Sequence, residues 1–108
     1  MDRYDFSMRL ERDFVEYVDR LADAKGMGKG EFAAKVWPED SRKAAANRWS
    51  AIRNTAANTG KPQGLPVSDA YRISRVLEFN LGLVLVLLED RGSGGRTELI
   101  GSENILRH

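Results

Sequence analysis

The residues best suited to chemistry in this chain of 108 residues are basic and amide side chains between positions 41 and 54. Lysine and arginine bind phosphates and the acceptor atoms of guanine, and asparagine pairs with adenine through two hydrogen bonds. If this segment is a helix, one side of it carries Lys43, Asn47, Ser50 and Asn54, flanked by Arg42, Arg48 and Arg53. This side has no carboxylate, so it predicts a surface that binds a polyanion.

The opposite side of the same helix is apolar and is expected to pack in the core; it carries Ala45, Ala46, Trp49 and Ile52. Trp49 could instead stack on a base, but its place among these apolar residues favours core packing. Ala44 and Ala51 lie toward the polar side, where small side chains would let the backbone approach a groove closely.

A second set of residues could contact phosphates, which position a protein on DNA without specifying sequence. Ser41 would act together with the helix N-terminus, whose backbone N–H groups bind anions. The other expected phosphate contacts are Lys29, Lys35, Ser50, Arg53 and Lys61.

The distribution of charge supports this prediction better than the net charge, which is only +1. Residues 41–66 contain five basic side chains and no acid, whereas acids outnumber arginines over residues 1–24. A basic segment beside a more acidic one is typical of a phosphate-facing surface. The alternative is that this basic segment is a solvated loop that binds no phosphate.

Several function classes are not expected from the composition. The chain has no cysteine, and its single histidine is His108, so disulfides, thiolate metal sites and imidazole catalysis are not expected. No catalytic triad, metal-ligand cluster or phosphate-binding glycine loop is present, so we expect neither an enzyme nor a metal or small-molecule cofactor. The N-terminus does not look like a secretory signal, and the apolar run of residues 81–88 is too short to span a bilayer. We therefore expect a cytoplasmic protein.

Apolar periodicity and helix-ending residues predict an all-α fold of five helices in one compact domain, residues 1–91, followed by a flexible tail, residues 92–108. Gly26 and Gly28 end the first predicted helix, and Pro38 ends the second. Asp40 or Ser41 caps the third and Ser68 the fourth. For the fifth, a β-hairpin returning through residues 97–100 is the alternative. The predicted helices cover residues 7–25, 29–36, 41–54, 69 onward and 83–90.

Three segments share their pattern with one known family. Residues 28–33 (Gly-Lys-Gly-Glu-Phe-Ala) open the second predicted helix, Ala46 and Trp49 lie three apart in the third, and residues 65–77 lead into and form the fourth. In these features, from about Phe14 to Glu89, the chain resembles the lambda-repressor and Cro-like (Xre-type) helix-turn-helix domains.

The resemblance implies a five-helix bundle that inserts residues 41–54 into the major groove of double-stranded DNA, as a bacterial or phage transcriptional regulator does. Carried over by position, the phosphate contact in the first turn of the motif falls on Lys29. The chain departs from the family at Trp37, where a glycine is usual, and its connection over residues 37–40 is about three residues longer. The base-contacting positions fall on Arg42, Lys43, Ala44, Asn47 and Arg48.

The main alternative is a protein-interaction module with the same fold and little or no DNA binding. The near-neutral net charge and the acidic first helix favour it. Small domains of this kind usually bind DNA as dimers. No motif specifies a homodimer here, although residues 81–88 could serve as a dimer seam as well as core.

Overall fold

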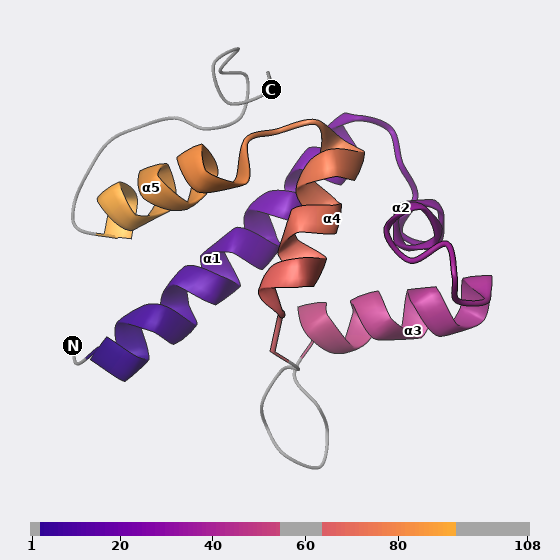
Figure 1. Cartoon of the computed structure of the whole chain (residues 1–108), viewed down its shortest axis with the longest axis horizontal. Coiled ribbons are helices and arrows are strands. Elements are labelled where there is room, and N and C mark those ends of the chain that lie inside the picture. Colours follow the sequence, from indigo (N-terminus) through magenta and orange to yellow (C-terminus); the bar gives the residue numbers. More distant parts are fainter. Residues whose placement is uncertain (1–2, 55–63, 93–108) are drawn as a thin grey trace.

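The computed structural model describes residues 3–54 and 64–92, which form five α-helices and no strand (Figure 1). This confirms the all-α prediction. None of the five combines the length and the apolar character that crossing a membrane requires. The helices are α1 (Arg3–Ala24), α2 (Lys29–Val36), α3 (Arg42–Arg53), α4 (Val67–Leu77) and α5 (Leu81–Gly92). The predicted tail begins one residue too early, because Gly92 ends α5; the rest of it, with the strand expected over residues 97–100, and Lys61 lie outside the described residues.

Helix α1 is longer than predicted at its N-terminus and ends where glycine was expected to end it. Gly26 adopts the left-handed conformation, with φ of +77°. The amide of Gly26 donates to the carbonyl of Asp23, and that of Met27 to the carbonyl of Ala22. These two bonds are the Schellman pattern, which satisfies the last carbonyls of a helix. Gly28 has a different role, because it is the extended N-cap of α2.

The fourth and fifth helices begin earlier than the sequence predicted. The N-cap of α4 is Pro66, so the expected cap Ser68 lies inside the first turn, and proline is suited to an extended position before a helix. Asn80 caps α5 by accepting the amide of Leu83 at 2.8 Å, and Gly82 does not interrupt that helix. The hairpin alternative is wrong for residues 81–92. They form one continuous helix, and this helix packs against α1.

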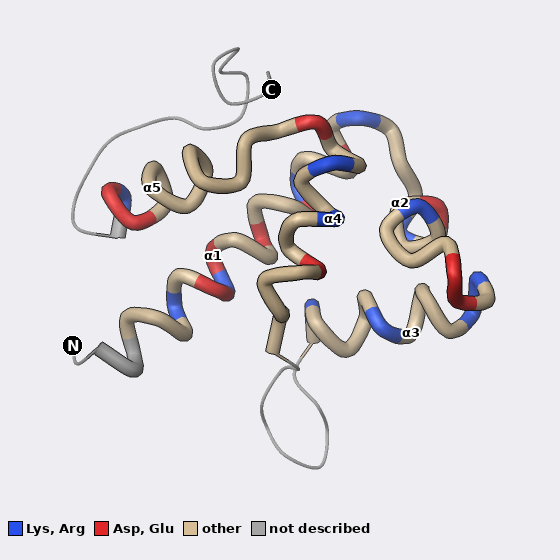
Figure 2. Tube along the Cα trace, viewed as in Figure 1, with Lys and Arg blue, Asp and Glu red and all other residues tan. Residues whose placement is uncertain are grey.

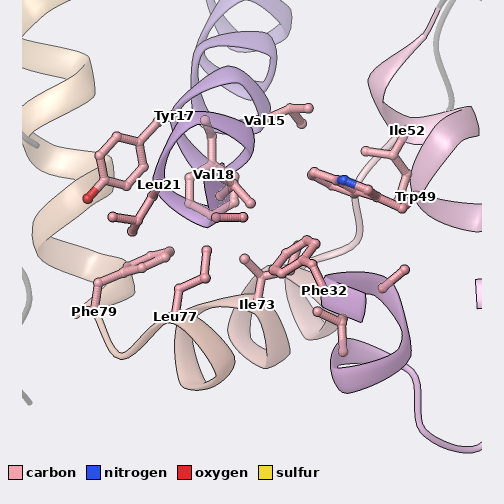
Figure 3. Packing of buried hydrophobic residues seen from close by; sticks show 14 of the residues in the cluster. Val15, Tyr17, Val18, Leu21, Phe32, Trp49, Ile52, Ile73, Leu77 and Phe79 are labelled. Atoms are coloured by element: carbon pink, nitrogen blue, oxygen red, sulfur yellow. The ribbon is translucent and has the colours of Figure 1, made fainter. Parts of the chain in front are cut away.

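The core joins all five helices. Figure 3 shows the part of it that α1 to α4 and Phe79 form. Phe32 of α2 packs edge-on against Trp49 of α3, with ring centroids 5.2 Å apart. Ile73 and Leu77 of α4 are fully buried in the same cluster. Trp49 is only 1 % exposed, which confirms that it packs in the core.

A second aromatic group closes the other end of the core. Glu78 takes a left-handed conformation with φ of 60°, and the amide of Phe79 donates back to the carbonyl of Ser74. This turn directs Phe79 into the core, where its ring lies edge-on to Phe14 and Tyr17. Burial raises the pKa of the Tyr17 phenol. The sequence patterns did not single out Phe79, because it lies between two helices.

Candidate nucleic-acid interface

Helix α3 is fixed by a cap at its first turn and by three buried side chains. The Ser41 hydroxyl accepts a hydrogen bond from the amide of Ala44 at 3.1 Å, so Ser41, not Asp40, is the cap. Ala45, Trp49 and Ile52 are buried. Ala46 was expected among them but is only partly buried, since it lies about a quarter turn from the centre of that stripe.

Six residues of α3 and its C-cap are exposed to solvent. Arg42 lies in the first turn on the same side as Trp49, seven positions later, and the others lie away from that side. We define the outer α3 face as the exposed residues Arg42, Lys43, Ala44, Asn47, Ala51 and Asn54. Arg42 and Lys43 form no ion pair with any other described residue. Figure 2 shows basic positions but no acidic position along α3. Four of the five predicted base-contacting residues are therefore exposed, and no exposed residue of α3 is a carboxylate.

The fifth, Arg48, lies at the flank of that face and is held by its neighbours. Its Nη2 is 2.9 Å from Oδ2 of Asp40. Its guanidinium carbon is 5.2 Å from the centroid of the Trp37 ring, within the range of a cation–π contact. Arg48 thus points toward the connection between α2 and α3.

The predicted phosphate contacts on α2 already have acidic partners. Nζ of Lys29 lies 3.0 Å from Asp19 and 4.0 Å from Asp23, both on α1. Nζ of Lys35 lies 3.8 Å from Glu31, one turn earlier on α2. Because these lysines are paired within the protein, the structure does not bring them to the outer α3 face as free cations.

The predicted phosphate contacts on α3 are also partly engaged. The Ser50 hydroxyl accepts a hydrogen bond from the side-chain amide of Asn54 at 3.0 Å. The guanidinium carbon of Arg53 lies 6.0 Å from the Trp49 ring, and its Nε is buried without a hydrogen-bond partner among the described residues. The Ser41 hydroxyl is used as the cap. Both Ser50 and Arg53 therefore border the outer α3 face instead of extending from its centre.

The connection between α2 and α3 is braced by α4. Trp37 is completely buried, and its Nε1 donates to Oδ1 of Asp69 at 3.1 Å. Nη1 of Arg72 donates to the carbonyl of Val36 at 3.1 Å and to both carboxylate oxygens of Glu39. Hydrogen bonds from Arg72 hold the pKa of Glu39 below its usual value, and the same bonds raise the pKa of Arg72.

Sequence reasoning missed this brace. Trp37 was noted only as a departure from the family pattern, and Asp69 and Arg72 were given no role. One signal was available, since a tryptophan in a short connection between helices has a large apolar surface that favours burial. The partners could not be identified in the same way, because Asp69 and Arg72 are more than thirty positions away.

Within residues 3–54 and 64–92 no group of His, Asp and Glu side chains is arranged to hold a metal ion. Comparisons of the chain with protein-family models, curated proteins and solved structures find no match. The functional interpretation therefore depends on the residue pattern and on the geometry described above.

Proposed function

We propose that the chain binds double-stranded DNA, with α2 and α3 acting as a helix-turn-helix and α3 entering the major groove. The observation that carries the proposal is the division of α3 into two sides. Trp49 and Ile52 are buried, and the outer α3 face presents Arg42, Lys43 and Asn47 to solvent without a carboxylate. A recognition helix needs this combination of a packed back and a cationic, hydrogen-bonding front.

The arrangement of the two helices supports the same proposal. In Figure 1, α2 is seen end-on and α3 side-on, so the helices cross steeply, as in helix-turn-helix motifs. They pack through Phe32 and Trp49. The connection over residues 37–41 is longer than the usual turn, but the hydrogen bond that Trp37 donates to Asp69 and the one that Val36 accepts from Arg72 hold it in place.

In this proposal, the residues of the outer α3 face make different contacts in the groove. Arg42 and Lys43, in the first turn, have the reach for guanine or phosphate, and Asn47 one turn later can make two hydrogen bonds to adenine. Ala44 and Ala51 are exposed and small, so they do not keep the backbone away from the groove. In this proposal the protein is a lambda-repressor-like regulator that acts in the cytoplasm.

A protein-interaction module is the second candidate, and one observation favours it. Val67 and Tyr71, one turn apart on α4, are 79 % and 57 % exposed. Exposed apolar side chains that lie together are common at sites of protein contact. A protein partner on α4 would not require the outer α3 face, so the two candidates can be separated by variants of α3.

The test measures duplex binding against salt concentration. Bound duplexes are first selected from a random library, and their affinity is then titrated by fluorescence anisotropy. We expect a log–log salt slope of roughly −3 to −6, because each neutralised phosphate releases counterions. Lys43→Gln should make the slope shallower by about 1. A flat response, or no shift of any duplex at low salt, would favour the protein-interaction module.

Lys25→Gln is the matched control, since Lys25 is exposed and directly follows the last residue of α1. That end of α1 lies in the upper part of Figure 1, whereas α3 lies in the lower part. The control should leave the slope unchanged. Equal effects of the two variants would mean that binding depends on net charge and not on the outer α3 face.

Asn47 tests sequence recognition separately from charge. Asn47→Ala should cost about 1–3 kcal/mol of binding free energy on the selected duplex and relax one base preference. The comparison uses the selected duplex and a scrambled duplex of the same length. An equal loss on both would show that Asn47 contacts only the DNA backbone.

A further inference from the structure

Arg48, in the middle of α3, differs from the two cations of the first turn in having an acidic partner. Arg42 and Lys43 are exposed and unpaired among the described residues, whereas Arg48 is 39 % exposed and forms an ion pair with Asp40. Asp40 is the more buried partner, with 19 % of its side chain exposed. The pair lies directly beside the outer α3 face, because Asp40 precedes the cap Ser41.

The surroundings of this pair leave Asp40 as the direct partner of Arg48. The neighbouring acid Glu39 is bound by Arg72 through both carboxylate oxygens, at 2.7 and 2.8 Å. Asp69 accepts the Nε1 hydrogen of Trp37. Trp37 also lies under the Arg48 guanidinium and is completely buried, so it cannot move to follow the arginine.

We propose that Asp40 competes with DNA phosphate for Arg48 and so limits the affinity of the outer α3 face. This inference rests on the proposed function. While Asp40 holds the guanidinium, Arg48 does not neutralise a phosphate. Because a partly exposed ion pair contributes little net stability, loss of the Asp40 charge frees Arg48 at little cost to the fold. The Asp40 carboxylate also lies beside the outer α3 face, where it repels an approaching phosphate. Asp40 thus acts on binding through Arg48. Arg48 is a potential phosphate contact that its ion pair with Asp40 keeps engaged within the protein.

The experiment compares wild-type protein with Asp40→Asn in duplex titrations over a range of salt concentrations. The variant releases Arg48 and removes the repelling carboxylate. We expect roughly three- to tenfold tighter binding at about 0.1 M salt, with a log–log slope steeper by about 1, because one more phosphate is neutralised. A purely structural role for Asp40 would not steepen the slope.

Three further variants separate this mechanism from other effects. Glu39→Gln removes the same charge one position earlier but releases Arg72 on α4, so the slope should stay as in wild type. Asp40→Glu keeps the carboxylate, so it should bind with the affinity of the wild type and not with that of Asp40→Asn. Adding Arg48→Gln to Asp40→Asn should abolish the gain in affinity and the increase in slope. Thermal melts of each variant verify that the fold is retained.

The outcomes distinguish this inference from the proposed function. If wild-type protein and Asp40→Asn both fail to bind any duplex, the proposed function fails, and this inference fails with it. If wild-type protein binds but Asp40→Asn shows unchanged or weaker affinity without a steeper slope, only the inference is overturned. The inference is also overturned if the gain persists when Arg48→Gln is added.

Discussion

At the scale of single residues, the outer α3 face depends on side chains that point away from it. Trp49 is 1 % exposed and packs edge-on against Phe32. It faces α2 from the middle of α3, so it sets how the two helices lie together. Its neighbour Ile52 is completely buried in the same cluster (Figure 3). The position of the outer α3 face therefore depends on the rigidity of the contact between Trp49 and Phe32.

We expect Trp49→Ala to lower the free energy of unfolding by about 3–5 kcal/mol, because it removes a large buried ring and leaves a cavity. Urea unfolding followed by circular dichroism measures the change. Tyr71→Ala is the control: Tyr71 is 57 % exposed, so its removal should stay within about 0.5 kcal/mol. Similar losses in the two variants would contradict the core role of Trp49.

At the scale of elements, the ends of the helices are set by different local devices. The hydroxyl of Ser41 caps α3, glycine in a left-handed conformation ends α1, and the Asn80 side chain caps α5. Helix α4 has no side-chain cap, because it begins after Pro66. The two serines near the starts of α3 and α4 thus have unlike roles, although the sequence predicted a cap at each.

This difference can be measured. Ser41→Ala should cost about 1 kcal/mol of stability, since it leaves an amide of the first turn of α3 without its partner. Ser68→Ala, inside the first turn of α4, should have an effect near zero. Thermal or urea unfolding of both variants makes the comparison. A loss at Ser68 equal to that at Ser41 would show that α4 begins at Ser68, as the sequence alone suggested.

At the scale of the whole molecule, α4 links the core to the connection between α2 and α3. Ile73 and Leu77 are buried in the core, while Asp69 and Arg72 of the same helix bind Trp37, Val36 and Glu39. One helix thereby fixes both the packing and the position of the connection that leads into α3. The orientation of the outer α3 face is thus a property of the assembled fold.

The bond between Glu39 and Arg72 should appear as a pH dependence of stability. The pKa of Glu39 is lowered below its usual 4.5 chiefly by its hydrogen bonds to Arg72. A lowered pKa stabilises the folded state above the unfolded value, and that stabilisation is lost as the pH falls through the folded value. Glu39→Gln should therefore lose less stability than wild type between about pH 5 and pH 3.

Urea midpoints across that range measure the effect, and Arg72→Gln is the second variant. It removes the partner that lowers the pKa, so it should flatten the same part of the curve. Wild-type and Glu39→Gln curves that stay parallel down to pH 3 would show that the Glu39–Arg72 bond does not contribute to stability.

The sequence by itself predicted the first four helices and the side of α3 that is buried, and it left the fifth element open between a helix and a hairpin. The spacing of apolar residues along a helix is a local property, so it predicted Trp49 and Ile52 as core and Arg42, Lys43 and Asn47 as exposed. The bounds of α2 agreed with the prediction, and the end of α1 at Gly26 followed from one residue type. The start of α4 could not be read in this way, because Ser68 and Pro66 are both acceptable before a helix.

Only the tertiary structure decided which cations of the predicted site are free. Lys29 is bound by acids of α1, and Arg48 is held between Asp40 and Trp37. The bonds that hold Trp37 and the connection join residues 32 and 36 positions apart. No local pattern encodes such pairs, because they form only once α1 and α4 have packed against α2 and α3. The sequence shows which residues are charged. Whether a charged side chain is free to bind a ligand depends on the residues that the fold places beside it.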